Sequence, residues 1–245
     1  MTNISFEEFI KDKKVAIVGP AKYLMGSEYG LEIDNHDVVV RINRSIETCD
    51  KFEKDVGKRS DVIYNCLIEK PENAGLISVD YFKSKQIKYV CIPPHSSMSG
   101  IAQGNNLSSG INRSTFRNVS ENFNTRIIDY KLNNKIAKDI HCRPNTGFLA
   151  IYDLLSKKPS SLSIYGFSFY LDGFIEGSKS GINDYDEEKF ALKCFNSKRH
   201  VQKNLWSYAS KTLLDNENVK LDDYLYFILN MKEFSKEEFK KFKRS

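Results

Sequence analysis

The sequence predicts an α/β fold: a single Rossmann-like domain in which helices flank a mainly parallel sheet. Short apolar runs rich in β-branched residues alternate with helix-like stretches, the pattern of a parallel sheet covered on both faces. The chain has 245 residues, which is enough for one sizeable core. It shows neither an internal repeat nor a clear linker. We therefore expect one domain over residues 1–245, with a motif-bearing core at about 14–214 and a helical extension at about 222–245.

Each expected strand is a short, continuous apolar run. The runs are KKVAIVG at 13–19, VVVRIN at 38–43, DVIYNCL at 61–67, KYVCIP at 88–93, RIID at 126–129 and SLSIYGF at 161–167. Helix-like stretches lie between or after them, at 74–84, 116–123, 131–139, 146–157, 187–194 and 199–214. Ligands of such folds bind at the carboxyl ends of the strands, so residues that directly follow a strand are the first candidates for a site.

Composition limits the function classes. Hydrophobic residues make up 40% of the chain and charged residues 28%, as in soluble globular proteins, and the net charge is +5. So small an excess favours an anionic ligand or a membrane surface and does not by itself indicate nucleic acid, which we do not expect as a partner. The five cysteines have no CxxC spacing, which predicts reduced thiols and no zinc site. With acidic residues where a signal peptide would be apolar, we expect a cytoplasmic protein, peripheral to a membrane at most.

Two segments each allow two interpretations. Residues 96–114 are rich in Gly, Ser and Asn, so they form either a disordered excursion or a lid over a site. Near the C-terminus, Phe239 and Phe242 share one face of a lysine-rich helix. This face would contact an anionic membrane surface or, as is more common for a terminal amphipathic helix, dock on its own domain.

The stretch RPNTGFLAIYDLL, residues 143–155, places a proline, a capping pair and a glycine directly before an apolar helix. An ordinary helix start has this composition. A socket for a nucleotide phosphate has it too, because the unpaired N–H groups of a first helical turn bind anions. The rules for helix starts alone do not separate the two. A similar question arises after the first strand, where VGPAKYLMGSEYG lacks the GxGxxG dinucleotide fingerprint but keeps glycines around a helix start.

A longer pattern surrounds that first glycine. The chain reads VGPAKYLMGSEYGLEIDNHDVVVRINRS and then FEKDVGKRSDVIYNC. Here it resembles the sialyltransferases, glycosyltransferase family 29, whose long motif runs roughly VGNS…L…S…G…ID-x-HD-x-V-x-R-x-N and then F-E-x-DVG. The positions in register are Gly19, Ser27, Gly30, Ile33, Asp34, His36, Asp37, Arg41, Asn43, Phe52, Glu53, Asp55, Val56 and Gly57.

The family's short motif has a counterpart as well. It begins at Pro144 and is followed by a helix and by a strand that ends in YGF, and His200 lies at about the distance of the histidine in the family's last motif. The resemblance thus covers about residues 14–214. It implies a GT-A-like variant of the Rossmann-like fold and a site for a CMP-activated sugar, which is a co-substrate, so no further cofactor is expected.

The resemblance gives most of the expected site residues their roles. Asn43 would bind the nucleotide, the start of the helix after Pro144 would hold ribose or phosphate, and a glycine after the last strand would let cytidine approach closely. Tyr64 and Asn65 are candidates for phosphate contacts on geometry alone, since they stand at the tip of the third strand. The expected donor-binding residues are Gly19, Pro20, Asn43, Tyr64, Asn65, Asn145, Thr146, Gly147, Gly166 and Phe167.

The expected reaction is an inverting, metal-independent transfer of sialic acid or a related ulosonic acid such as Kdo to a glycan or glycolipid hydroxyl. His200 is the expected general base, because an ordinary histidine pKa of about 6.5 suits that role near neutral pH. Asp184-Tyr185-Asp186 has the DxD form of a metal site, but it directly precedes a helix and is better explained as its cap. We expect His36 to order the turn before the second strand.

Several positions depart from the family pattern. Pro20 and Ala21 replace an Asn-Ser pair, the two motif cysteines of secreted members are missing, and so is the glutamate that follows the last histidine. Either Tyr170 or Tyr185 is a candidate counterpart of the family's intermediate motif. These departures keep two other hypotheses open: a non-catalytic protein that binds a sugar nucleotide or glycan, and a different nucleotide-dependent transferase such as a methyltransferase.

Overall fold

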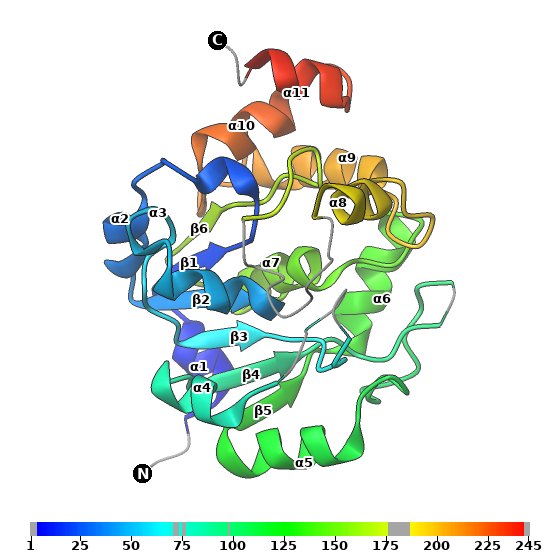
Figure 1. Cartoon of the computed structure of the whole chain (residues 1–245). Helices are drawn as coiled ribbons and strands as arrows, with labels where there is room; N and C mark the ends of the chain where they lie inside the picture. The colour runs from blue at the N-terminus through cyan, green and yellow to red at the C-terminus, as the bar shows by residue number, and fades with distance from the viewer. Residues whose placement is uncertain (1–3, 71–73, 75–76, 98, 176–186, 243–245) are drawn as a thin grey trace.

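A parallel sheet of seven strands lies at the centre of the molecule, in the order β5-β4-β3-β2-β1-β6-β7 (Figure 1). The structure is a computed structural model and describes residues 4–70, 74, 77–97, 99–175 and 187–242. The strands are β1 (Lys14–Val18), β2 (Val38–Ile42), β3 (Val62–Tyr64), β4 (Tyr89–Ile92), β5 (Asn124–Ile127), β6 (Ser161–Tyr165) and β7 (Val219–Leu221). The predicted α/β class with a parallel sheet is confirmed.

Helices cover both faces of this sheet (Figure 1). They are α1 (Phe6–Ile10), η1 (Lys22–Leu24), α2 (Gly30–Asp34), η2 (Asn43–Asp50), α3 (Glu53–Val56), α4 (Val79–Ser84), α5 (Arg113–Asn122), α6 (Tyr130–Asp139), α7 (Thr146–Ser156), α8 (Glu187–Phe195), α9 (Gln202–Leu213), α10 (Asp223–Asn230) and α11 (Lys236–Phe242). Side chains of β1 alternate between two apolar clusters. Val15 and Ile17 pack with α6, α7 and α9, whereas Ala16 and Val18 pack with α2, α10 and α11. A strand buried on both faces has no polar alternation, which is why its sequence is a continuous apolar run.

The course of the chain creates a switch point at β1. From β1 the strands follow one another outward to β5, and the chain then returns to place β6 on the other side of β1. The connections after β1 and after β6 therefore leave the sheet in opposite directions. This divergence opens a crevice at the carboxyl ends of the two strands, where folds of this class bind ligands.

The elements predicted from sequence are present, with shifted ends. The fifth strand, expected at 126–129, begins two residues earlier, and the first expected helix is shorter than its range of 74–84. β7 and α1 were not predicted, because β7 is only three residues long and half-buried and α1 has only five residues. Their apolar side chains are too few to give a periodic signal.

The C-terminal helix docks on its own domain, the commoner of the two arrangements considered. Phe239 is only 1% exposed and packs near Tyr224, while the ring of Phe242 stacks on Phe227 with centroids 3.8 Å apart. The apolar face that a membrane would need is thus already used inside the chain. No helix among the described residues is both long and apolar enough to cross a bilayer.

Within residues 96–114, part of the segment is tied to α6. The side chain of Asn134 accepts a hydrogen bond from the Ala102 N–H at 2.6 Å and donates one to the Ala102 carbonyl at 3.1 Å. Residue 98 lies outside the described part of the chain. A role of this segment as a lid stays a prediction.

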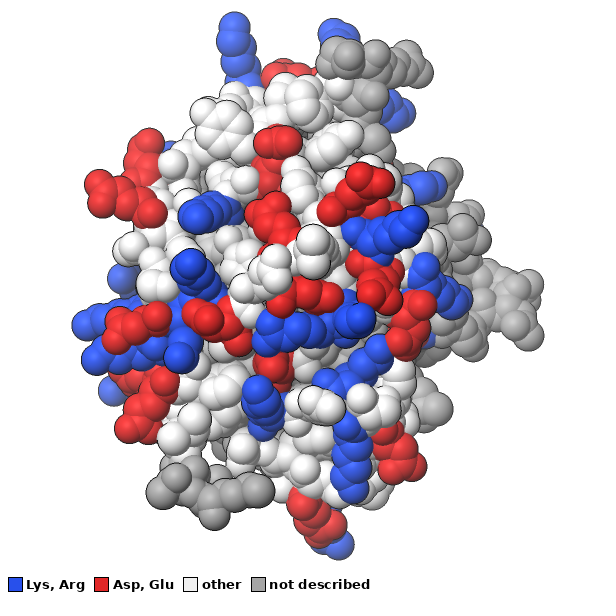
Figure 2. Space-filling view, turned by 90° about the vertical axis from the view of Figure 1, so that its left-hand side faces the viewer, with Lys and Arg blue, Asp and Glu red and all other residues white. Residues whose placement is uncertain are grey.

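Charge on the face drawn in Figure 2 is mixed in sign, with Lys and Arg side chains interspersed among Asp and Glu side chains. Several described pairs are close enough to interact, among them Lys58 and Glu53 at 3.1 Å. Exposed pairs of this kind contribute little to stability, typically about 0–1 kcal/mol, so this face has the character of an ordinary solvated surface.

Candidate functional site

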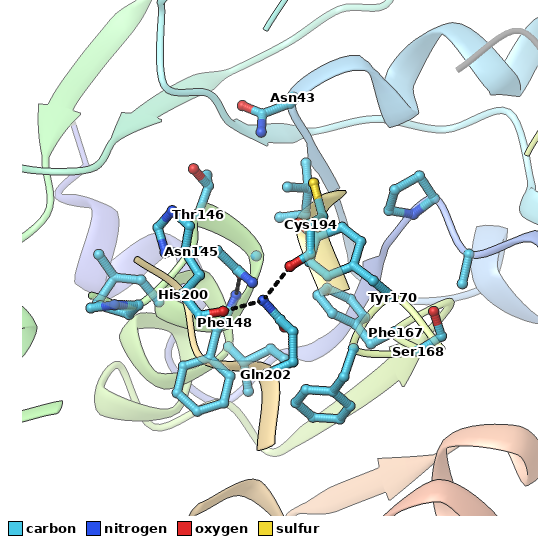
Figure 3. A pocket seen from close by; sticks show the side chains of 18 of the residues that line it. Asn43, Asn145, Thr146, Phe148, Phe167, Ser168, Tyr170, Cys194, His200 and Gln202 are labelled. Carbon is cyan, nitrogen blue, oxygen red and sulfur yellow. Dashed lines mark hydrogen bonds between the residues drawn. The ribbon is translucent and has the colours of Figure 1, made fainter. Parts of the chain in front are cut away.

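A cavity of about 340 Å³ opens at the switch point, bounded by the chain after β1, β2, β3 and β6 and by the start of α7 (Figure 3). This volume falls in the range of small-molecule sites. Eight of the expected site residues line it: Pro20, Asn43, Asn145, Thr146, Gly147, Gly166, Phe167 and His200. The structure therefore brings together, from five separate segments, most of the residues that sequence reasoning selected.

The start of α7 supplies the cavity with backbone donors. Asn145 is the N-cap, and its Oδ1 accepts the Phe148 N–H at 2.9 Å. The first helical bond runs from the Leu149 N–H to the Asn145 carbonyl, so the N–H groups of Thr146 and Gly147 precede the helical ladder. Helix capping here leaves room for an anion, because Asn145 satisfies the N–H group of Phe148 and the two earlier N–H groups precede the helical ladder.

Asn43 stands at the end of β2 with a left-handed backbone, φ 47°. Asparagine tolerates this conformation better than most residues. Its Oδ1 accepts the Cys66 N–H at 3.0 Å, which ties the end of β2 to the chain after β3. Its side-chain nitrogen has no hydrogen-bond partner among the described residues and is therefore available as a donor to a ligand (Figure 3).

His200 lines the cavity with its ring orientation fixed. Its Nδ1 lies 2.7 Å from the Arg143 carbonyl oxygen. Because a carbonyl can only accept, Nδ1 carries the proton and Nε2 keeps a lone pair. The segment is held further by Ser197 Oγ, which accepts the His200 N–H at 3.1 Å, and by Gln202 Nε2, which donates to the His200 carbonyl at 2.6 Å (Figure 3).

Burial sets the charge of this imidazole. Desolvation, with a smaller contribution from the nearby Arg199 cation, lowers the pKa of His200 from 6.5 to about 4. The ring is therefore neutral at pH 7. A neutral imidazole with a free Nε2 lone pair can accept a proton from a hydroxyl group, and a charged one cannot.

Gly19 and Gly166 mark the closest passage between the chains that leave β1 and β6. A Cβ on Gly19 would lie 2.4 Å from the Gly166 carbonyl oxygen, and one on Gly166 would lie 2.5 Å from Leu24 and 2.6 Å from the Gly19 carbonyl oxygen. Gly166 also has φ 74°, which favours glycine. The close approach of the two backbones is enough to require glycine at both positions, without a ligand. Gly166 still lines the cavity, but Gly19 does not.

Tyr64 and Asn65 do not line the cavity. The Tyr64 ring is completely buried in the core beneath α7, and its hydroxyl donates to Asp153 at 2.6 Å. Asn65 is 1% exposed, and its Oδ1 accepts the Leu67 N–H at 2.8 Å. Both side chains therefore serve the fold in this conformation, in contrast to the phosphate contacts predicted for them.

The cavity also contains residues that sequence reasoning missed or left open. Tyr170 was one of two candidates for an unaligned motif. It lines the cavity, and burial raises its pKa, which keeps the phenol protonated as a donor. The other candidate, Tyr185, and the Asp184-Tyr185-Asp186 triplet lie outside the described residues. Further lining residues are Arg44, Ser45, Pro93, Pro94, Ser168, Lys193, Cys194 and Gln202. Arg44, Ser45, Pro94 and Ser168 come directly after predicted strands, so their position was a signal that could have found them, whereas Lys193 and Cys194 lie at the end of a helix and carried none.

Comparison with known proteins decides the family. The model of glycosyltransferase family 29 (sialyltransferase) matches residues 8–174, which is more than half of the chain. The chain belongs to glycosyltransferase family 29. Among curated proteins it is similar to the β-1,6-galactosyltransferase GALT29A of Arabidopsis thaliana, with 29% identity over 99 residues. That match covers 39% of this chain and 24% of the relative, so it spans about a quarter of the relative's length.

Two solved structures illustrate the structural likeness. A mammalian sialyltransferase in complex with Gal-β-1-3GalNAc-ortho-nitrophenol has 16% identity and a TM-score of 0.47, over 88% of this chain and 71% of that one. The sialyltransferase CstII from Campylobacter jejuni, in complex with the substrate analogue CMP-3FNeuAc, has 15% identity and a TM-score of 0.43, over 85% and 78% of the two chains.

The charged residues of the family 29 long motif build the scaffold behind the cavity. Asp34 accepts the backbone N–H groups of Lys58 at 3.0 Å and Arg59 at 2.9 Å. Arg41, fully buried, donates to the carbonyls of Gly57 and Arg59. These bonds fasten the chain before β3 to α2 and β2 at the amino ends of the two strands, opposite the strand ends that form the cavity.

His36 has the structural role expected of it. Its Nδ1 lies 2.9 Å from the Glu32 carbonyl, and its Nε2 lies 2.8 Å from Ser163 Oγ on β6. It joins the turn before β2 to the sheet, away from the cavity.

No group of three His, Cys, Asp or Glu side chains suited to holding a metal occurs in the described part of this family 29 chain.

Proposed function

We propose that this chain transfers a sialic acid or a related ulosonic acid such as Kdo from its CMP-activated form to a hydroxyl group of a glycan or glycolipid. The observation that carries the proposal is the pairing, in one cavity, of a neutral, oriented imidazole with the unpaired N–H groups of a helix start. The first can accept a proton and the second can bind a phosphate, and glycosyl transfer from a nucleotide needs both.

The nucleotide is assigned to the side of the cavity formed by α7 and β2. The N–H groups of Thr146 and Gly147 and the positive end of the α7 dipole would hold the phosphate. The side-chain nitrogen of Asn43, which lies across the cavity from the start of α7, would donate to the ribose or base (Figure 3). The sialyltransferase CstII, whose structure contains the analogue CMP-3FNeuAc, is consistent with this assignment.

The reaction is a single displacement. The acceptor oxygen forms a bond to the anomeric carbon while the bond from that carbon to the phosphate oxygen breaks, and CMP leaves with the electron pair. The hydroxyl proton passes to His200 Nε2. Developing charge on the phosphate is met by fixed N–H donors, whose contribution is typically about 3 kcal/mol per donor. Because the acceptor attacks the face opposite the phosphate, the configuration at the anomeric carbon inverts.

His200 is a weak base where protein groups alone surround it, because its pKa there is about 4. The proposed donor brings a phosphate and a carboxylate, two negative charges that raise the pKa of a neighbouring imidazole. Donor binding would therefore strengthen the base at the moment when it is needed. In the free chain the low pKa keeps Nε2 unprotonated over the whole physiological range.

The name of the Arabidopsis relative favours a second donor class, an activated galactose. Galactosyl transfer would use the same base but a donor with a different nucleotide and no carboxylate. A donor panel separates the two: CMP-Neu5Ac, CMP-Kdo, UDP-galactose and, for the methyltransferase alternative, S-adenosylmethionine.

The deciding experiment measures release of the nucleotide from each donor, in EDTA and in added Mg²⁺, by wild type, His200→Gln and His141→Gln. His141 is exposed and outside the cavity, so its variant is a matched control. We expect CMP release from a CMP-ulosonic acid that is unaffected by EDTA, unchanged in His141→Gln, and reduced by roughly 10²–10⁴ in His200→Gln. Equal rates in wild type and His200→Gln would reject His200 as the base. Binding of CMP without any release would favour a non-catalytic binding protein.

A second measurement separates binding from folding at the α7 start. Thr146→Pro removes one of the two unpaired N–H groups at the first position of α7, where proline is tolerated, so it should weaken CMP binding more than it lowers the free energy of unfolding. A large loss of stability with unchanged CMP affinity would reduce this stretch to an ordinary helix start.

A further inference from the structure

The cavity wall formed by residues 166–170 has an unfavourable backbone. Gly166 has φ 74°, and Phe169 and Tyr170, two consecutive aromatic residues, have φ 50° and 60°. For residues with a Cβ, each such conformation costs about 1–3 kcal/mol and persists only where surrounding contacts enforce it. All five residues of this wall line the cavity. Whatever holds the wall therefore also shapes the cavity.

Asp222 and Tyr23 hold the first end of the wall. The Gly166 N–H donates to Asp222 Oδ2 at 2.9 Å, and the Phe167 N–H donates to the Tyr23 hydroxyl at 2.9 Å. The Tyr23 hydroxyl in turn donates to the same Asp222 oxygen at 2.8 Å. Asp222 is 4% exposed, and its other oxygen caps α10 by accepting the Leu225 N–H at 2.7 Å.

Among the described residues, the hydrogen bonds of these two side chains thus run to each other, to the wall and to α10. Burial raises the pKa of Asp222 to about 6, against the opposing effect of its N–H donors. A carboxylate is costly to bury, and here it is tolerated because three donors surround it.

Phe234, between α10 and α11, holds the other end. Its ring meets Phe169 edge-on, with centroids 6.3 Å apart. It also stacks on Phe195 at 5.6 Å and on Trp206 at 5.5 Å. In Figure 1, α10 and α11 lie at the same end of the molecule as α8 and α9. The wall is therefore fixed by polar contacts at residues 166–167 and by ring contacts at residue 169.

We propose that the C-terminal segment, residues 222–234, is a positioning element that holds the wall 166–170 in its nucleotide-binding shape. The inference rests on the proposed function for the identity of the ligand. Asp222 and Phe234 lie beyond residues 8–174, the part that matches the family model. They touch the wall and not the cavity itself, so they act through Gly166, Phe167 and Phe169.

The test compares variants that cut these contacts with matched variants elsewhere. Asp222→Ser keeps a cap for α10 but is too short to reach Gly166, and Tyr23→Phe removes the hydroxyl that accepts the Phe167 N–H. The control for the first is Asp129→Ser at the N-cap of α6, and the control for the second is Tyr152→Phe, whose hydroxyl pairs with Thr212 at 2.6 Å. Phe234→Ala cuts the ring contacts, and Phe234→Tyr should restore them.

Two quantities are measured on the full chain: the hydrogen exchange of the Gly166 and Phe167 amides, and the Kd of CMP by calorimetry. We expect Asp222→Ser and Tyr23→Phe to speed exchange at these amides and to raise the Kd roughly tenfold, the effect of losing one or two buried hydrogen bonds. Phe234→Ala should also raise the Kd, and it should change the fluorescence of Trp206, the single tryptophan. Asp129→Ser and Tyr152→Phe should change neither exchange at the wall nor the Kd.

Wild-type affinity for CMP in both Asp222→Ser and Tyr23→Phe would overturn the inference. If wild type itself does not bind CMP, the proposed function fails, and amide exchange then decides the inference separately. Faster exchange at Gly166 and Phe167 in both variants would still support a positioning element for the wall. Unchanged exchange would reject it.

Discussion

Burial of the His200 imidazole makes the stability of the fold depend on pH in a way that one substitution can isolate. The pKa of His200 is about 4 in the folded chain, and its ordinary value, which the unfolded chain would show, is 6.5. Between these two values the unfolded chain binds a proton that the folded chain does not. Stability is therefore fully present above pH 6.5 and is lost progressively as the pH falls from 6.5 toward 4.

The size of the effect follows from the two pKa values. At pH 5 almost all unfolded chains carry the proton on His200, and only about a tenth of folded chains do. The difference corresponds to roughly 1–2 kcal/mol of unfolding free energy once the partial exposure of the ring is taken into account. This is a sizeable share of the 5–15 kcal/mol by which domains are typically stable.

The assay is urea unfolding at pH 7.5 and pH 5.0 for wild type, His200→Gln and His141→Gln. Carboxylates titrate in all three proteins, so only the difference between them is interpreted. Wild type and His141→Gln should lose roughly 1–2 kcal/mol more than His200→Gln on going from pH 7.5 to 5.0. If all three lose the same amount, His200 titrates normally and is not desolvated. The argument that Nε2 stays free of protons at low pH would then be refuted.

Three other substitutions separate site from scaffold. Tyr64→Phe removes the hydroxyl that donates to buried Asp153, so the free energy of unfolding in urea should fall by about 1–3 kcal/mol with no change in CMP affinity. Weaker CMP binding by this variant would instead show that Tyr64 belongs to the site. Gly166→Ala should lower the free energy of unfolding by more than about 2 kcal/mol, because the added Cβ would meet Leu24 and Gly19. The control Gly26→Ala is also at positive φ but in open space, so it should lower the free energy of unfolding by only about 1 kcal/mol. Equal melting temperatures for the two variants would disprove the close passage at Gly166. Phe239→Ala should lower the free energy of unfolding by about 3–5 kcal/mol, because the ring is buried in the domain. For the same reason, wild type should not sediment with vesicles that contain phosphatidylglycerol. Sedimentation of wild type would support the membrane interpretation.

How far the sequence predicts the fold depends on the kind of signal that each element carries. The first four strands are continuous apolar runs, and the structure places them side by side in chain order. β7 has only three residues at the edge of the sheet, two half-buried and one exposed, and no comparable run. The N-cap of α7 at Asn145 was predicted correctly because capping is a local rule that short-range sequence contains in full.

The misplacement of Tyr64 has a physical cause. A strand buried on both faces is apolar at every position, so its sequence does not reveal which side chains point to which face. Tyr64 ends β3 and points to the face covered by α7, where Asp153 accepts a hydrogen bond from its hydroxyl. Cys66 lies beyond the end of β3, where the strand alternation no longer applies, and it lines the cavity instead. Position at a strand tip was the correct criterion, but it could not choose between neighbouring residues.

Gly166 shows a second limit of prediction from sequence. It was expected to make room for a ligand, whereas in the structure it makes room for neighbouring backbone and side-chain atoms. Its missing Cβ allows Gly19 and Leu24 to approach, and its N–H is held by Asp222 from a segment 56 residues away. His200 likewise depends on a backbone carbonyl, that of Arg143, which no side-chain pattern can reveal. In both cases the sequence identifies the residue and the tertiary contact determines what it can do. The chemistry of the cavity therefore depends on partners outside the motifs, and the variants at Asp222 and Tyr23 test that dependence directly.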